Sequence, residues 1–313
     1  MIKLFNQSIG RPRLTKTRTS IRGWAASAAF ISMLALAVAP ARADERSFVF
    51  SSIDVPGATF TQAFGINAGG EVVGFYIDAT GKQHGFLRSG ETFTSIDFPG
   101  AAATDARGIS SGGDIVGTYR QAGEPDVNFH SYLLTRQGEF IPVDFPGHIS
   151  TAAQRILADG TILGCYHDTD QMDTMYGMVA SRDGFSGFDM ATTMHTGATP
   201  DGKKIVGFLN TAGGIHGYLL DGLNFMPFDV PGSTLTQAWD INPSGDIVGL
   251  YNAAGKRHGF LAENGQFTAI DVPGATATRV FGINAGGDVT GRYVDASGKS
   301  HGFVGSRTHG HNR

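Results

Sequence analysis

Asp168, Asp170 and Asp173 form an Asp-x-Asp-x-x-Asp segment whose carboxylates could bind a metal ion. Carboxylate oxygens are the ligands that a hard cation such as Ca²⁺ takes in proteins. The segment lacks the glycine and the terminal glutamate of a helix–loop–helix calcium loop, and surface loops tolerate acidic sequences that have no function. We therefore expect no cofactor, with a calcium ion at these three aspartates as the alternative.

Other polar side chains with possible binding roles stand where one repeat of the chain differs from the rest. A residue that recurs in every repeat most simply serves packing or a turn, whereas a residue that differs at an equivalent position is free to serve function. The second and third repeats have longer loops, and the crossing into the fourth repeat is irregular. The ligand-binding candidates in these segments are Glu124, Asp126, His148, His167 and His195. The candidates near the start of the innermost strands, where we expect the mouth of a central channel, are Gln62, Asp105, Gln237 and Arg279.

The chain shows no pattern that identifies a catalytic centre. Gly108-Ile109-Ser110-Ser111-Gly112 matches the G-x-S-x-G elbow of serine hydrolases. That elbow requires a strand, a turn and a helix, whereas this segment aligns with the hairpin turn after Gly65. The sequence also contains no phosphate-binding loop, no zinc spacing of Cys and His and no dinucleotide fingerprint. We therefore predict no catalytic residues.

These positions are organised by a repeat that begins with Ile53-Asp54-Val55-Pro56-Gly57. Its aspartate recurs with steps of 43, 47, 45, 40 and 42 residues, at Asp54, Asp97, Asp144, Asp189, Asp229 and Asp271. Each unit contains four short β-rich runs separated by glycine-containing turns, with no helical periodicity. Units of this length with four strands are typical of propeller blades.

The ends of the chain predict how the repeat closes. The sixth unit, near residues 271–304, lacks a fourth strand, and residues 48–53 form a spare one. We predict an all-β, six-bladed propeller of four-stranded blades, closed by this N-terminal strand and occupying residues 44–313 as one domain. The other units lie near 54–96, 97–143, 144–188, 189–228 and 229–270, and residues 305–313 form a tail. An open stack of six units is the alternative.

Two recurrent polar residues are expected to have structural roles. The aspartate of each repeat is predicted to accept N–H groups of the turn that follows it. The histidines His84, His216, His258 and His301 are predicted to make hydrogen bonds between blades. The six-fold arrangement would hold these histidines too far apart to share a metal ion.

The N-terminal region predicts export. Residues 1–43 carry seven Lys or Arg and no acid, with an apolar stretch at 24–40 and then Ala41-Arg42-Ala43. This order is typical of a cleaved secretory signal, and an uncleaved anchor helix is the alternative. Cleavage leaves 17 Lys and Arg against 28 Asp and Glu. An acidic chain repels nucleic acid and anionic lipid heads, so we expect no nucleic-acid partner. The signal predicts a secreted or periplasmic protein with no membrane span after its removal. We expect a monomer whose partner is a glycan or an extracellular protein. The single cysteine, Cys165, allows no internal disulfide.

The repeated Gly-Ile-Asn, Val-Gly-x-Tyr and His-Gly-Phe segments resemble the bacterial HAF-repeat family of exported proteins. The tripeptide that names the family stands here at His84-Gly85-Phe86, with copies from His216, His258 and His301. Glycine replaces the family's alanine, and the second and third units depart further, at His130-Ser131-Tyr132 and Tyr176-Gly177-Met178. The resemblance covers roughly residues 48–304, and it implies the repeat type and export but no catalytic residue.

These observations favour a non-catalytic binding module for a glycan, a peptide or a component of the cell envelope. An extracytoplasmic hydrolase or lactonase with its site at the channel mouth is one alternative. It would need two titratable groups close to the substrate, and the sequence places no such pair. A structural surface protein is the other alternative.

Overall fold

The structure is a computed structural model that describes residues 48–125, 128–167 and 175–308. Within these ranges the chain forms 24 strands, and the described residues contain no helix able to cross a membrane. The chain divides into two units, Met1–Glu45 and Arg46–Arg313. The first unit lies outside the described residues, so the predicted secretory signal at 1–43 stays a prediction.

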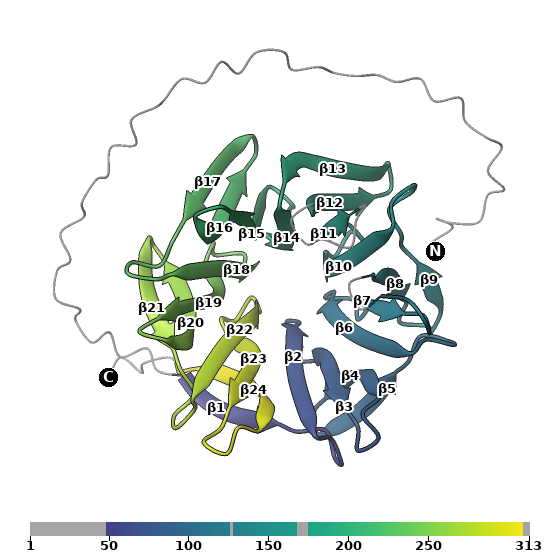
Figure 1. Cartoon of the computed structure of the whole chain (residues 1–313), viewed down its shortest axis with the longest axis horizontal. Helices are drawn as coiled ribbons and strands as arrows, with labels where there is room; N and C mark the ends of the chain where they lie inside the picture. Colours follow the sequence, from purple (N-terminus) through teal and green to yellow (C-terminus); the bar gives the residue numbers. More distant parts are fainter. Residues whose placement is uncertain (1–47, 126–127, 168–174, 309–313) are drawn as a thin grey trace. The chain divides into compact units, whose positions relative to one another are not determined.

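The strands form antiparallel sheets that are arranged around an axis (Figure 1). Four separate sheets have four strands each. From the inner to the outer edge they are β10 (Ser150–Ile156), β11 (Ile162–His167), β12 (Tyr176–Ser181) and β13 (Gly184–Ala191); β14 (Thr193–Ala198), β15 (Lys204–Thr211), β16 (Gly214–Asp221) and β17 (Asn224–Phe228); β18 (Leu235–Ile241), β19 (Ile247–Ala253), β20 (Lys256–Glu263) and β21 (Gln266–Ile270); and β22 (Ala277–Ile283), β23 (Val289–Val294), β24 (Ser300–Arg307) and β1 (Phe48–Ile53).

The first two sequence units share one sheet of eight strands. The first unit supplies β2 (Phe60–Ile66), β3 (Val72–Ile77), β4 (Gln83–Ser89) and β5 (Thr92–Ile96), and the second supplies β6 (Ala103–Ile109), β7 (Ile115–Arg120), β8 (His130–Leu134) and β9 (Phe140–Pro142). They are joined by a single parallel bridge between Gln83 and Ala103. The prediction of six separate four-stranded sheets was therefore wrong in its count, because β4 and β6 approach closely enough to pair at this one position.

Strand β1 lies antiparallel to β24 at the far end of the sequence. The pairing runs from Phe48 opposite Arg307 to Ile53 opposite Gly302. Ile53 is buried, and the Phe50 ring packs edge-on against Phe303 with centroids 5.6 Å apart. The spare N-terminal run identified in the sequence thus occupies the fourth position of the last sheet.

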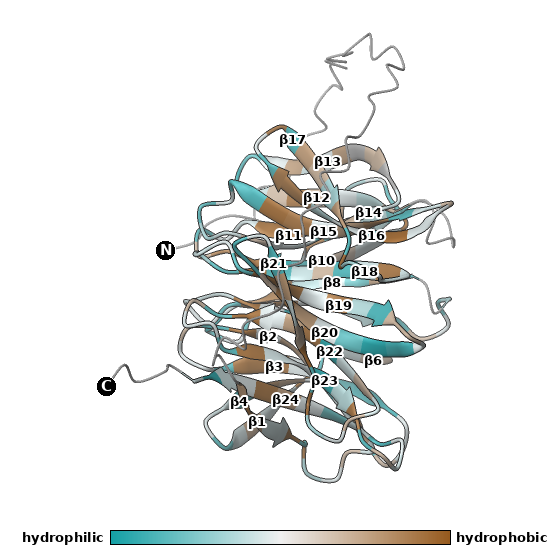
Figure 2. Ribbon diagram, turned by 90° about the vertical axis from the view of Figure 1, so that its left-hand side faces the viewer, coloured by the Kyte–Doolittle hydropathy of each residue, from teal (hydrophilic) through white to brown (hydrophobic). Residues whose placement is uncertain are grey.

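The Val-Gly-x-Tyr and His-Gly-Phe segments recur because they fit each other. In the first unit, a Cβ on Gly74 would lie 2.7 Å from the Phe86 ring, so only glycine lets that ring cross strand β3. Gly249 and Phe260 repeat this contact in the fifth unit. These rings are fully buried between neighbouring sheets, and apolar segments lie along the strands (Figure 2). Steric fit inside each sheet therefore accounts for two of the repeated motifs.

The recurrent histidine and aspartate bind each other within one sheet. His84 Nδ1 lies 2.7 Å from Asp97 Oδ1, and the same pair joins His216 to Asp229, His258 to Asp271 and His301 to Asp54. The turn N–H is bound by a threonine instead: Val55 N donates to Thr61 Oγ1. The predictions of a turn acceptor and of bonds between blades were therefore wrong, because the aspartate follows the fourth strand and reaches the histidine of the adjacent third strand.

Candidate functional site

The innermost strands place one residue of each unit at the same level around the axis. Each of these residues pairs with the same position of the second strand, as Gln62 does with Phe75 and Arg279 with Arg292. We call this set the inner row. Its members are Gln62, Asp105, Ala152, Met194, Gln237 and Arg279.

The inner row lies toward the side of the molecule that carries the crossings between units. Thr59 N in the first crossing donates to Ile77 O at the turn between the second and third strands, at 2.8 Å. Thr276 N and Val294 O form the same bond in the last unit. The crossings and these turns therefore share one side. We call this side the crossing face.

The inner row is more accessible on one side of the axis than on the other. Gln237 and Arg279 are half-buried, whereas Gln62, Asp105, Ala152 and Met194 are buried, with 8%, 4%, 8% and 8% of their surfaces exposed. The polar and more accessible residues thus belong to the fifth and sixth units, next to Gln62 of the first. We call Gln237, Arg279 and Gln62 the polar arc.

Aromatic side chains of three innermost strands form a cluster next to this row. The Phe64 ring lies 5.2 Å from Phe281 and 6.4 Å from Trp239, which come from two other units. Trp239 and Phe281 pack edge-to-face at 4.9 Å. Because Phe64 of the first unit contacts Trp239 of the fifth, these rings meet near the axis.

Arg107 links this aromatic cluster to Asp105. Its guanidinium lies 4.9 Å from the centre of the Phe64 ring and donates to both oxygens of Asp105, the shortest bond being 2.8 Å. Thr118 donates its N–H and its hydroxyl to the same carboxylate. The carboxylate of Asp105 is therefore fully engaged by protein donors, although the sequence predicts it at the mouth of the channel.

A buried ion pair joins the third unit to the fifth. Arg155 Nη2 lies 2.5 Å from Asp240 Oδ2, and Asp240 also accepts the N–H of Ile283. The fourth unit lies between them and has Gly197 here, where a Cβ would lie only 2.7 Å from Asp240. Burial raises the pKa of Asp240 to about 6 although Arg155 acts to lower it, so the carboxylate is charged and paired at neutral pH.

Two of the predicted loop residues have defined partners. Glu124 Oε1 lies 3.0 Å from His130 Nε2, and this contact lowers the pKa of Glu124. His148 packs against the rings of Phe145 and Tyr166. Both side chains lie in the second and third units, away from the polar arc.

The other predicted residues of these loops are His167, Asp126 and the three predicted calcium ligands. His167 is a buried residue at the end of β11. Asp126 and the predicted calcium ligands Asp168, Asp170 and Asp173 lie outside the described residues. In the part of the chain that is described, no three His, Cys, Asp or Glu side chains are placed to hold a metal ion.

His195 lies between the third and fourth units, where the other units have alanine or valine. Its Nδ1 is 2.6 Å from Tyr218 Oη, and the ring fills the space beside Gly177. Tyr218 donates its hydroxyl to Met194 O, so Nδ1 must carry the proton in the second bond. Burial lowers the pKa of His195 to about 4.

The buried His195 predicts a loss of stability in acid. Its folded pKa of about 4 lies below the unfolded value of 6.5, so the unfolded state binds the proton more tightly and stability falls as the pH drops through this window. We therefore expect the wild type to lose unfolding free energy when the pH falls from 7 to 4. The variant His195→Asn should lose about 3 kcal/mol less over the same range. Urea unfolding of both proteins at both pH values measures this.

The comparison with His195→Asn is needed because Asp240 acts in the opposite direction. Its folded pKa of about 6 lies above the ordinary 3.8, so its contribution to stability decreases as the pH rises between these values. Asp240 is present in both proteins and cancels in the difference. Equal losses on acidification in the two proteins would contradict the assignment to His195.

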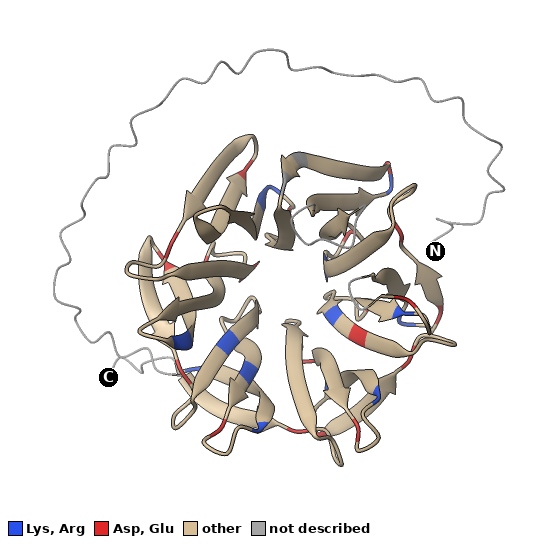
Figure 3. Cartoon of the chain, in the orientation of Figure 1, with Lys and Arg blue, Asp and Glu red and all other residues tan. Residues whose placement is uncertain are grey.

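Two arginines near the polar arc were missed by the sequence reasoning. Arg292 stands on β23 opposite Arg279, and Arg257 is on β20 of the neighbouring sheet. The signal was present in the repeat, because the position of Arg292 is occupied in the other units by uncharged residues: Phe75, Thr118, Cys165, Phe208 and Leu250. Basic segments on β22, β23 and the start of β20 lie in the same part of the molecule (Figure 3).

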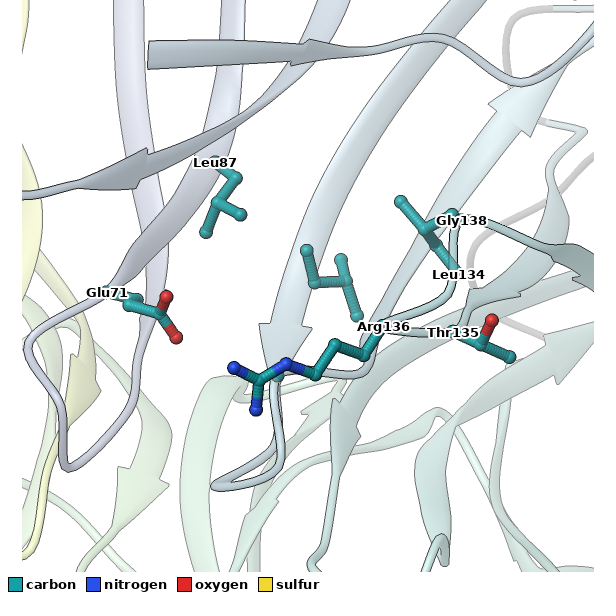
Figure 4. Close-up of a pocket in the computed structure, with 8 residues that line it drawn as sticks. Glu71, Leu87, Leu134, Thr135, Arg136 and Gly138 are labelled. Carbon is teal, nitrogen blue, oxygen red and sulfur yellow. The ribbon is translucent and has the colours of Figure 1, made fainter. Parts of the chain in front are cut away.

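A pocket of about 220 Å³ lies on the side opposite to the crossing face, between the first two units. Leu87, Ile115 and Leu134 form its apolar part, and the charged groups of Glu71 and Arg136 face each other across it (Figure 4). Arg136 Nη1 donates to Gly112 O, and Glu71 accepts from Asn67 and Ser89. Since its polar groups are bound by the protein itself, this pocket is a useful control site.

Comparison with known proteins defines the fold class. No protein-family model and no curated protein matches the chain. A putative TolB from Agrobacterium tumefaciens is 13% identical with a TM-score of 0.55, covering 84% of this chain and 99% of that one. The β-propeller domain of the Trilobed protease from Pyrococcus furiosus is 11% identical with a TM-score of 0.51, covering 80% and 95%. A lectin from Aleuria aurantia is 11% identical with a TM-score of 0.51, covering 80% and 96%. The chain thus has a β-propeller arrangement of four-stranded blades.

Proposed function

We propose that the protein is an exported, non-catalytic β-propeller that binds a glycan at the polar arc of the crossing face. The observation that carries this proposal is the uneven inner row. Gln62, Gln237 and Arg279 make no described side-chain hydrogen bond, while Asp105 on the other side of the axis is fully engaged. Amide and guanidinium donors without protein partners are the groups that a ligand can use.

Aromatic surface next to the polar arc supports a sugar as the ligand. Phe60 and Phe75 are half-buried and stack with their centroids 5.2 Å apart. Flat apolar rings beside a few hydrogen-bonding groups suit a molecule that has both an apolar face and hydroxyl groups. The Aleuria aurantia lectin, whose fold is similar, binds Fucα1-6GlcNAc. The fold can therefore serve this kind of function.

The proposal also covers the number of blades and the way in which the propeller closes. We take the eight-stranded sheet as two blades joined by one bridge, which gives six, and β1 as the strand that closes the last blade. The single residue pair between β4 and β6 and the six pairs between β1 and β24 support this view. Export through residues 1–43 and membership of the HAF-repeat family belong to the same proposal.

A glycan array tests the function directly. We expect the protein that begins at Asp44 to bind a defined group of glycans. The variant Gln62→Ala/Gln237→Ala should bind them roughly ten-fold or more weakly, since each lost hydrogen bond contributes about 1 kcal/mol. Arg136→Ala, in the pocket on the opposite side, is the control and should bind like the wild type.

Three results would count against the proposal. The absence of any bound glycan would favour a structural surface protein. Chemical turnover of a bound glycan would favour the hydrolase alternative. Loss of binding in Arg136→Ala but not in Gln62→Ala/Gln237→Ala would place the site in the opposite pocket.

A further inference from the structure

Three arginines gather beside the polar arc without a carboxylate partner among the described residues. Arg279 has no described hydrogen bond or ion pair, Arg292 lies over the Phe60 ring at 5.2 Å, and Arg257 donates only to Asn252 Oδ1. Several other arginines of the described chain are paired with acids: Arg107 binds Asp105, Arg155 binds Asp240 and Arg307 binds Glu263. The cluster therefore stands out in a chain that has more acids than bases.

The arrangement of these arginines is unfavourable as it stands. Arg279 and Arg292 are directly opposite each other on neighbouring strands, and like charges in this position destabilise a sheet. The Nε of Arg292 is buried and has no hydrogen-bond acceptor. Burial and the positive charge of Arg257 both act to lower the pKa of Arg292. An anion at this place would supply the acceptor and the opposite charge that the protein does not.

The shape of the donors indicates which anion fits. An arginine presents a planar fork of N–H groups that matches the two oxygens of a carboxylate, and two forks side by side can hold one carboxylate from both sides. The neighbouring Phe60 and Phe75, which stack on each other, add half-buried apolar surface, and Gln62 and Gln237 add amides. We propose that Arg279 and Arg292 bind the carboxylate of an acidic sugar, so that the ligand is a uronate-containing glycan. This proposal rests on the proposed function and names its ligand class.

The test uses a pair of saccharides that differ only in charge. A glucuronate-containing tetrasaccharide and its carboxyl-reduced counterpart share the same rings and linkages. We expect the wild-type protein to bind the acidic form roughly ten- to hundred-fold more tightly, as a charge-assisted hydrogen bond predicts. Arg279→Gln should reduce this preference to near unity, and added salt should weaken binding of the acidic form only. Isothermal titration calorimetry measures all four affinities.

A second readout does not depend on the ligand. Because Arg279 faces Arg292 without a partner, Arg279→Gln should raise the melting temperature of the free protein by about 1–3 °C. The matched control is Arg107→Gln, which removes an arginine that is paired and should lower it. A lower melting temperature for Arg279→Gln would show that Arg279 supports the fold and would overturn the inference.

The remaining outcomes separate this inference from the proposed function. Equal binding of the two saccharides, unchanged by Arg279→Gln, would overturn the acidic ligand and leave a neutral glycan at the same site. Inorganic phosphate bound as tightly as the saccharide, with the same dependence on Arg279, would show an adventitious oxyanion only. If neither saccharide binds and the glycan array shows no bound glycan, both proposals are wrong.

Discussion

Arg155→Met should destabilise the protein by about 3–5 kcal/mol. The substitution leaves the carboxylate of Asp240 buried near the axis without its positive partner, which lies 2.5 Å away in the wild type. A buried charge that loses its partner costs more than the pair contributes, because neither water nor another cation can replace it. Equilibrium unfolding in urea at pH 7 measures the loss.

The double variant Arg155→Met/Asp240→Asn separates the charge effect from packing. Asparagine keeps a carbonyl oxygen that can accept the N–H of Ile283 but has no charge to satisfy. We therefore expect the double variant to recover more than half of the stability lost in Arg155→Met. Equal losses in the single and double variants would mean that the side-chain volume of Arg155 matters and the ion pair does not.

Removal of residues 44–53 should destabilise the protein as much as Arg155→Met or more. The deletion removes all six residue pairs between β1 and β24 and the buried side chain of Ile53, and it uncovers Phe303. Burial of the apolar side chains of β1 alone stabilises by about 5 kcal/mol. We expect the melting temperature to fall by roughly 10 °C or more, measured by circular dichroism.

Two further measurements show whether the loss of stability is specific to β1. Removal of residues 309–313 is the control for shortening the chain and should leave the melting temperature near the wild-type value. A synthetic peptide with the sequence of residues 46–55 should restore part of the loss when it is added to the deleted protein, because the exposed edge of β24 can pair with it. A deletion that melts like the wild type would contradict closure by β1.

The sequence predicts the strands well because each unit repeats the same local constraints. The four β-rich runs expected in the first unit correspond to β2, β3, β4 and β5, and glycine-containing turns separate them. The alternation of apolar and polar residues within a strand and the glycines between strands are local signals. They recur in each of the six units. The joining of β4 to β6 was not predictable in this way because it depends on the spacing between sheets.

The contacts that cross between units were harder to predict. Arg155 and Asp240 stand where four other units have glycine, and their opposite charges were a visible clue. Their pairing across Gly197 depends on the bulge in each innermost strand, which sequence spacing does not reveal. In the same way, His195 looked like a loop residue because the crossing before it is irregular, whereas the structure buries it against Tyr218.

The candidate site was predicted in part. Gln62, Gln237 and Arg279 do share one level near the axis, because strands with equivalent register place equivalent residues together. The loop residues of the second to fourth units stay a prediction where they lie outside the described part of the chain. Arg292 was missed because it stands inside a strand rather than in a variable loop, although it is the only charged residue at its position in the six units.

Hydrogen–deuterium exchange in the presence of the glucuronate tetrasaccharide tests binding at the polar arc most directly. The account predicts slower exchange in the segments around Phe60–Gln62, Gln237 and Arg279–Arg292, with no change around Gly113 and Arg136 on the opposite side. Protection confined to the opposite side, or to the outer strands, would contradict it.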